Sequence, residues 1–257
     1  MAEASLKELL ATSSLAFSGT VRSLGESPVA GVEADERTAV VQVDAALHAP
    51  EELDLAPGDA VTVQLSPDQP ALQPGERATF FTVPVVYADT LVVAEVGRMA
   101  AEAITTARVG SPEAPASPVE DALAEIDQDA IREHALDADA VVRGHVIALQ
   151  AVDPRETLHE HHPHWWIATL LVDLVQRGDV PDVGEEGGEV RVVYANSLDI
   201  RWRRWPKPKA GQSGMWILHR TADELAELAP FQLTHPEDLQ PSLQLELLRD
   251  NGTGGAR

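Results

Sequence analysis

Cysteine is absent from the 257 residues of this chain, which excludes disulfide bonds and thiol chemistry. Positive charge is scarce: 19 basic residues stand against 42 acidic ones, and the formal net charge is −23. A surface this negative is repelled at long range by nucleic-acid phosphates and by anionic lipid. The composition therefore argues against nucleic acid as a partner and favours a basic one.

Long apolar runs are also missing. No stretch approaches the roughly 18 residues of a membrane span. The first ten residues carry acidic side chains where a signal peptide needs basic ones. We therefore expect a cytoplasmic protein without a membrane partner. Hydrophobic residues still make up 44% of the chain, enough for a globular protein of two domains.

What the chain does contain is one pattern twice, about 125 residues apart. Leu15–Leu24 in the first copy matches Ala140–Leu149 in the second without a gap. Gly19 and Gly144 thereby occupy the same place in an apolar strand. Later strand blocks match with modest changes of offset, which indicates a tandem duplication.

Each copy has the pattern of a helix followed by about five short strands. Ser117, Pro118 and Glu120 form a capping box that begins the second helix, and its apolar spacing ends near residues 134–137. Alternating apolar and polar residues, separated by Gly/Pro turns, indicate antiparallel strands. The fold class that this predicts is mainly β, with short helices: two tandem five-stranded β-barrels, each preceded by a helix.

Composition also suggests where the domains begin and end. We expect the first barrel over 1–107 and a Pro/Gly/Ser linker over 108–116. The second helix and barrel, with two loop insertions, are then expected over 117–242. A Gly-rich, partly disordered tail is expected over 243–257.

The second copy resembles a known family. A glycine-containing apolar strand at Ala140–Leu149 precedes Ile167–Val175, and a valine-rich strand then leads to Gly211–Leu218. This order is similar to the netrin/tissue-inhibitor-of-metalloprotease type of OB barrel, over roughly 138–240 and more faintly over 13–97. The resemblance implies OB-like barrels that bind another molecule and do not catalyse its conversion. The inhibitors of that superfamily act through an N-terminal cysteine, which this chain lacks.

The first insertion of the second copy is rich in histidine. It falls between the first and second strands and contains His159, His161, His162 and His164, with Glu160 among them. Imidazoles two residues apart share a face of an extended segment and suit zinc or another divalent transition metal. The alternative is an exposed polar loop, because the spacing matches no established zinc-enzyme motif.

The second insertion, between the third and fourth strands, is basic and aromatic. It contains Arg201, Trp202, Arg203, Arg204, Trp205, Lys207 and Lys209. Arginine and tryptophan are common hot-spot residues at protein interfaces, and they also bind and stack on single-stranded nucleic acid. The alternative is an ordinary loop whose cations pair with the acidic surface of this same protein.

These observations predict a non-enzymatic binding or assembly protein. The basic insertion would contact a protein partner of unknown identity, and no catalytic residue or cofactor is predicted. Metal binding by the four histidines is the first alternative, and single-stranded nucleic-acid binding by residues 201–209 is the second.

Overall fold

The computed structural model describes residues 4–29, 34–87, 91–101, 104, 117–152, 164–184, 187–197 and 199–241. The chain divides into two compact units, Met1–Asp127 and Gln128–Arg257. The linker expected over 108–116 and the tail expected over 243–257 lie outside the described residues.

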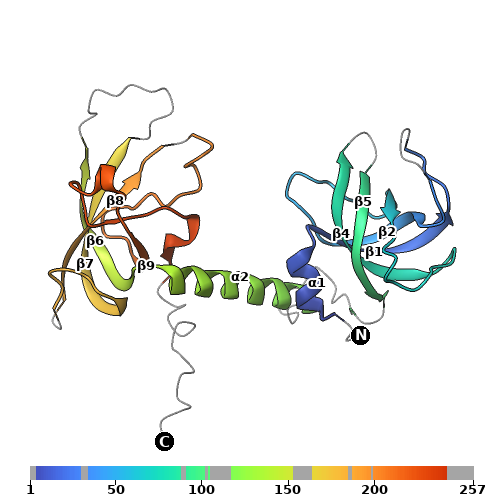
Figure 1. Ribbon diagram of the computed structural model, residues 1–257, viewed down its shortest axis with the longest axis horizontal. Coiled ribbons are helices and arrows are strands. Elements are labelled where there is room, and N and C mark those ends of the chain that lie inside the picture. Colours follow the sequence, from blue (N-terminus) through green and yellow to red (C-terminus); the bar gives the residue numbers. More distant parts are fainter. Residues whose placement is uncertain are drawn as a thin grey trace, which may run out of the picture. The chain divides into compact units, whose positions relative to one another are not determined.

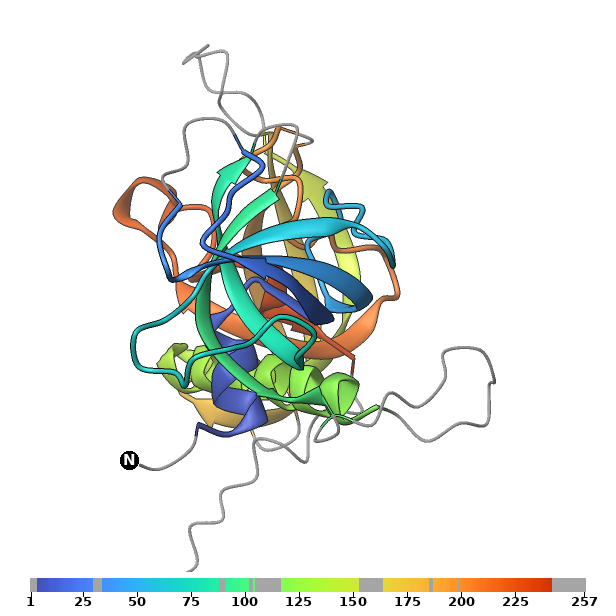
Figure 2. The same ribbon diagram turned by 90° about the vertical axis from the view of Figure 1, so that its right-hand side faces the viewer.

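The first unit contains a closed five-stranded barrel (Figures 1 and 2). Its strands, in spatial order, are β1 (Leu15–Leu24), β2 (Thr38–His48), β3 (Ala60–Gln64), β5 (Leu91–Ala100) and β4 (Arg77–Tyr87). The strand β4 pairs with β1 and closes the barrel, while β3 and β5 run parallel. This is the five-stranded Greek-key arrangement of an OB fold.

The second unit repeats the same topology. Its strands are β6 (Ala140–Ala151), β7 (Trp165–Gly178), β8 (Gly188–Ala195), β9 (Ser213–Arg220) and β10 (Phe231–Gln232). The two-residue strand β10 runs parallel to β8 and antiparallel to β9, which closes the ring. A further short strand, β11 (Leu239–Gln240), pairs with β9. The predicted fold class, two tandem barrels each preceded by a helix, is confirmed.

The duplication extends to the register of the strands. Gly19 on β1 lies opposite Val43 on β2 and Ala78 on β4. In the same way, Gly144 on β6 lies opposite Val172 on β7 and Gly214 on β9. Each glycine follows an irregularity in the pairing of its strand with the next one. A strand that bends this sharply around a small barrel brings its backbone close to its neighbour, where no side chain fits.

Two helices precede the barrels. The helix α1 (Leu6–Thr12) begins with a capping box between Ser5 and Glu8. The helix α2 (Pro118–Asp137) begins with the predicted box, in which the Glu120 N–H donates to Ser117 Oγ and the Ser117 N–H donates to Glu120 Oε2. Two 3₁₀ turns, η2 (Asp223–Leu225) and η3 (Pro236–Asp238), follow β9.

Each unit has its own hydrophobic core. Phe17 stacks on Phe80 inside the first barrel, with ring centroids 5.5 Å apart. Trp216 occupies the centre of the second, fully buried, and its indole N–H donates to the Gly144 carbonyl at 3.1 Å. Among the described residues, no helix has the length and apolar character needed to cross a membrane.

The helix α2 contributes to both cores. In the first unit, Val119 and Ala122 pack with Leu9, Leu10 and Phe81. In the second unit, Ile131 and Ala135 from its last turns are buried against β6 and β9. They pack with Val141, Met215 and Ile217. This packing fixes the last turns of α2, and with them His134, on the second barrel.

Candidate functional site

The histidine-rich segment lies almost entirely outside the described residues, which exclude 153–163. His159, His161 and His162 fall there, so the metal site that they would form stays a prediction. His164 is described and exposed just before β7, and its carbonyl accepts a hydrogen bond from the Asn196 N–H at 2.8 Å.

The basic insertion is a loop between β8 and β9, here called the basic loop (residues 196–212). The Trp202 N–H donates to the Asp199 carbonyl at 2.9 Å, and the Trp205 N–H donates to the Trp202 carbonyl at 3.0 Å. The Arg201 N–H also donates to the Asp199 carboxylate at 3.0 Å. Consecutive turns therefore define the path of the backbone.

Three of the predicted contact residues hold the basic loop together. Trp202 is only 7% exposed, and the half-buried Trp205 meets its ring edge-on with centroids 6.4 Å apart. The Lys207 ammonium donates to the Trp202 and Trp205 carbonyls at 2.8 and 2.9 Å. Burial lowers the pKa of Lys207. Trp202 and Lys207 are thus engaged within the loop itself.

The remaining cations are presented to solvent. Arg201 lies over the Trp202 ring, with its guanidinium carbon 5.1 Å from the ring centroid. Arg203, Arg204 and Lys209 are exposed, and within the described part of the chain no side chain pairs with their charged groups. The Lys209 backbone N–H donates to Gln212 Oε1 at 2.9 Å. The neighbouring Ile200 is 80% exposed.

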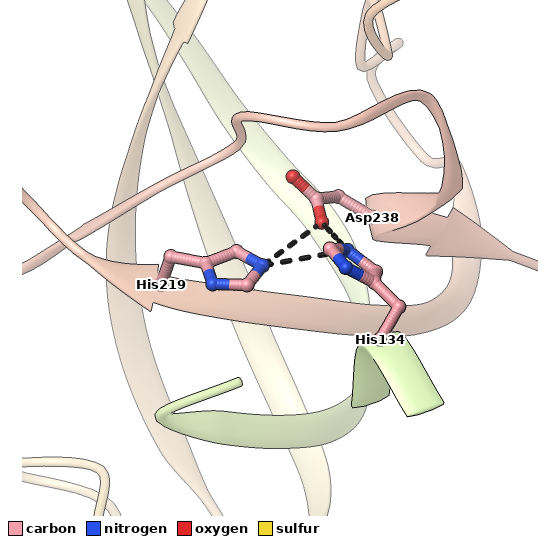
Figure 3. Close-up of side chains that lie close together, drawn as sticks. All are labelled: His134, His219 and Asp238. Atoms are coloured by element: carbon pink, nitrogen blue, oxygen red, sulfur yellow. Dashed lines mark hydrogen bonds and ion pairs between the residues drawn. The ribbon is translucent and has the colours of Figure 1, made fainter. Parts of the chain in front are cut away.

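A second constellation lies elsewhere in the same unit, where His134, His219 and Asp238 converge (Figure 3). His134 comes from the last turn of α2, His219 from β9, and Asp238 from η3. The Asp238 side chain is fully buried, whereas those of His134 and His219 are 19% and 18% exposed. The carboxylate is therefore shielded from solvent, whereas part of each imidazole side chain reaches it.

The three side chains meet through single atoms. Asp238 Oδ1 lies 2.6 Å from His134 Nε2 and 3.2 Å from His219 Nε2, and the two Nε2 atoms are 3.4 Å apart. The exposed His235 ring lies beside that of His134, tilted by 41° with centroids 4.5 Å apart. One carboxylate oxygen thus lies within hydrogen-bond distance of two imidazole nitrogens.

The other oxygen of Asp238 is held by the backbone. Oδ2 accepts hydrogen bonds from the Thr234 N–H at 2.5 Å and from the His235 N–H at 2.7 Å. Burial opposes ionisation of Asp238, but the bonds from His219, His134 and these N–H groups together hold its pKa below the ordinary value. The hydrogen bond to Asp238 raises the pKa of His219, against the opposing effect of burial.

Sequence reasoning missed this cluster. It correctly ended a helix near His134, but it assigned no common role to His134, His219 and Asp238. His134 and Asp238 are 104 positions apart, so no local pattern links them. The only signal in the sequence is the presence of two histidines and one aspartate at the ends of elements that the barrel brings together.

No family model matches this chain, and the search of curated proteins found no match either. The function therefore has to be inferred from the chemistry of the two constellations in the second unit.

Proposed function

We propose that this protein is a non-enzymatic binding protein that captures an acidic protein surface through the basic loop. The observation that supports this best is that some side chains of the loop stabilise its backbone while others remain available to a partner. Trp202 and Lys207 fix its backbone, whereas the guanidinium groups of Arg203 and Arg204 have no partner in the described part of the chain.

The internal contacts matter because they lower the entropic cost of binding. A loop that is ordered before it meets its partner loses less conformational freedom on association. Arg201 is likewise restrained by its contact with the Trp202 ring. Arginines that are held in place but not neutralised are effective partners for carboxylates, which they bind through two parallel hydrogen bonds.

Ile200 adds an apolar contact next to these cations. A branched side chain that is 80% exposed contributes nothing to the core, and its burial by a partner would add hydrophobic stabilisation. An isolated exposed isoleucine is ordinary by itself. Beside three arginines, it favours a protein surface that carries carboxylates around an apolar pocket.

Single-stranded nucleic acid is less well supported as the partner. Base stacking needs an exposed aromatic face, but Trp202 is buried and Trp205 is half-buried. The net charge of −23 adds long-range repulsion of phosphate groups. A protein partner avoids the first difficulty, because contacts with carboxylates need no exposed aromatic face. This agrees with the binding role that the resemblance to netrin-type barrels implies.

The test compares two triple variants with the same loss of charge. Arg201, Arg203 and Arg204 are replaced by alanine in the loop variant, which leaves Trp202 in place. The control variant carries alanine at the exposed Arg22, Arg143 and Arg191. Wild type and both variants are immobilised and exposed to lysate of the source cell, with and without nuclease, and retained proteins are quantified by mass spectrometry.

We expect an acidic partner that wild type and the control variant retain and that the loop variant loses, regardless of nuclease. Equal retention by all three proteins would contradict the proposal. Loss of the partner on nuclease treatment would assign the loop to nucleic acid instead.

A further inference from the structure

The cluster of His134, His219 and Asp238 presents three atoms that can bind one cation. Its three facing atoms are two imidazole nitrogens and a carboxylate oxygen, each with a lone pair in at least one protonation state. Without a cation, both Nε2 atoms need a proton, because an unprotonated nitrogen would point its lone pair at Asp238 Oδ1. Two N–H groups are then directed at one oxygen from nitrogens only 3.4 Å apart.

The separations of these atoms suit a small metal ion. Ligand bonds of about 2.0–2.2 Å in a tetrahedral site place neighbouring donor atoms about 3.3–3.6 Å apart. The distance of 3.4 Å between the two Nε2 atoms and that of 3.2 Å between His219 Nε2 and Asp238 Oδ1 are close to this separation. The His134–Asp238 distance of 2.6 Å is that of a hydrogen bond. It needs to open by less than about 1 Å when an ion replaces the proton.

The surroundings hold the donor atoms in place. Asp238 Oδ2 is bound by two backbone N–H groups, which orient Oδ1 toward the histidines. His219 lies on β9, which is paired on both sides, and His134 follows Ile131 in the packed part of α2. Such secondary contacts orient metal ligands and raise affinity.

We propose that His134, His219 and Asp238 form a binding site for a divalent transition metal ion, with Zn²⁺ as the reference ion. Two imidazoles favour zinc and its neighbours over Ca²⁺ and Mg²⁺, which prefer oxygen ligands. Three protein ligands leave a coordination position open. Both histidine side chains are partly exposed. Water, or an anionic group of another molecule, completes the coordination there.

This site is separate from the metal site predicted at 159–164, and the two are distinguished by substitution. One variant replaces His159, His161, His162 and His164 by glutamine. A second carries His134→Gln and His219→Gln, which keep an N–H donor for Asp238 but remove the imidazole ligands. The control is His145→Gln, because His145 is partly exposed on β6 and lies 3.9 Å from Asp173.

Proteins without an affinity tag are stripped with a chelator, dialysed, and titrated with Zn²⁺ by calorimetry at neutral pH. We expect one ion per chain at this site in wild type, in the control and in the 159–164 variant. The double variant should bind more than about 100-fold more weakly, because loss of a secondary contact alone costs about 10–100-fold. Unchanged binding by the double variant, or complete loss in the 159–164 variant, would overturn the proposal.

A measurement on the wild-type protein makes the test independent of whether the variants fold. Long-range ¹H–¹⁵N NMR spectra of the imidazole rings are recorded before and after one equivalent of Zn²⁺. Coordination should shift the Nε2 signals of His134 and His219 and leave those of His145 in place. Unshifted signals from both His134 and His219 at saturation would refute the site.

Discussion

Gly144 lies where β6 passes so close to β7 that a single methyl group does not fit. A Cβ built there meets the Leu171 carbonyl oxygen at 2.4 Å and Val172 Cα at 3.1 Å, both backbone atoms of a paired strand. Gly19 has the same problem in the first barrel, with the Gln42 carbonyl oxygen at 2.8 Å. The equivalence of the two glycines across the duplication therefore reflects the curvature of a small barrel.

We expect Gly144→Ala to destabilise the second unit by about 1–3 kcal/mol, the usual cost of overpacking, or more because the obstacle is backbone. Gly184→Ala is the control, since nothing lies within 4 Å of a Cβ there. Urea unfolding followed by tryptophan fluorescence measures the difference. Equal stability of the two variants would contradict this, because it would show that β7 moves away from the added methyl group at little cost.

Glu95 is a buried carboxylate in the first barrel whose charge is only partly compensated. It accepts a hydrogen bond from the Ser66 N–H at 2.8 Å and pairs with Arg98 at 3.0 Å. Burial nevertheless dominates and raises the pKa of Glu95. The folded state therefore keeps this proton to higher pH than the unfolded state does. The stabilising contribution is present at acid pH and is lost as pH rises through the folded pKa.

Glu95→Gln removes this titration and keeps an oxygen for the Ser66 N–H. The stability of wild type relative to the variant should therefore fall as pH rises above about 4, where the carboxyl of the unfolded chain ionises first. Chemical unfolding at several pH values, followed by circular dichroism, measures it, with the exposed Glu36→Gln as control for charge. A stability difference that does not change with pH would contradict the argument.

At the scale of elements, the basic loop shows how two neighbouring tryptophans take different roles. Trp202 is buried and its ring is contacted by Trp205 and Arg201, whereas Trp205 remains half-buried. The loop is therefore a small packed element, and its exposed arginines depend on the buried indole for their position.

We expect Trp202→Ala to destabilise the second unit by about 3–5 kcal/mol, as is usual for removal of a buried tryptophan. Trp205→Ala should cost about 1 kcal/mol, as is common for partly exposed positions. Thermal unfolding of both variants distinguishes them. If the costs were equal, the loop would not be anchored by Trp202.

At the scale of the whole molecule, the two units have separate cores and different spectroscopic probes. All five tryptophans lie between positions 165 and 216, in the second unit. Tryptophan fluorescence therefore follows that unit alone, while circular dichroism follows both. This allows the metal site to be tested through stability.

Zn²⁺ at about 100 times its dissociation constant should stabilise the second unit by about 2.7 kcal/mol. The fluorescence-detected unfolding midpoint should rise, chelator should reverse the change, and acid should weaken it because the imidazoles must be deprotonated to bind metal. The part of the circular-dichroism transition that belongs to the first unit is the internal control. A zinc-induced shift of that part alone would place the metal elsewhere.

The sequence alone determined those features that depend on neighbours along the chain. The duplication, the capping box at Ser117, the alternating strands and the two barrel glycines follow from local periodicity, since backbone pairing and side-chain direction repeat every two or 3.6 residues. The composition of the basic loop was equally visible, and with it the proposed contact residues.

Only the tertiary structure decided which of these residues meet. The strand β10 has two residues, too few for any pattern, and it forms because barrel closure supplies partners on both sides. The burial of Trp202 likewise depends on the loop folding back on itself. His219 lies 85 positions from His134 and 19 from Asp238, and closure of the second barrel brings their side chains within 3.4 Å of one another. Distances of this kind are set by packing between elements, which local sequence does not encode.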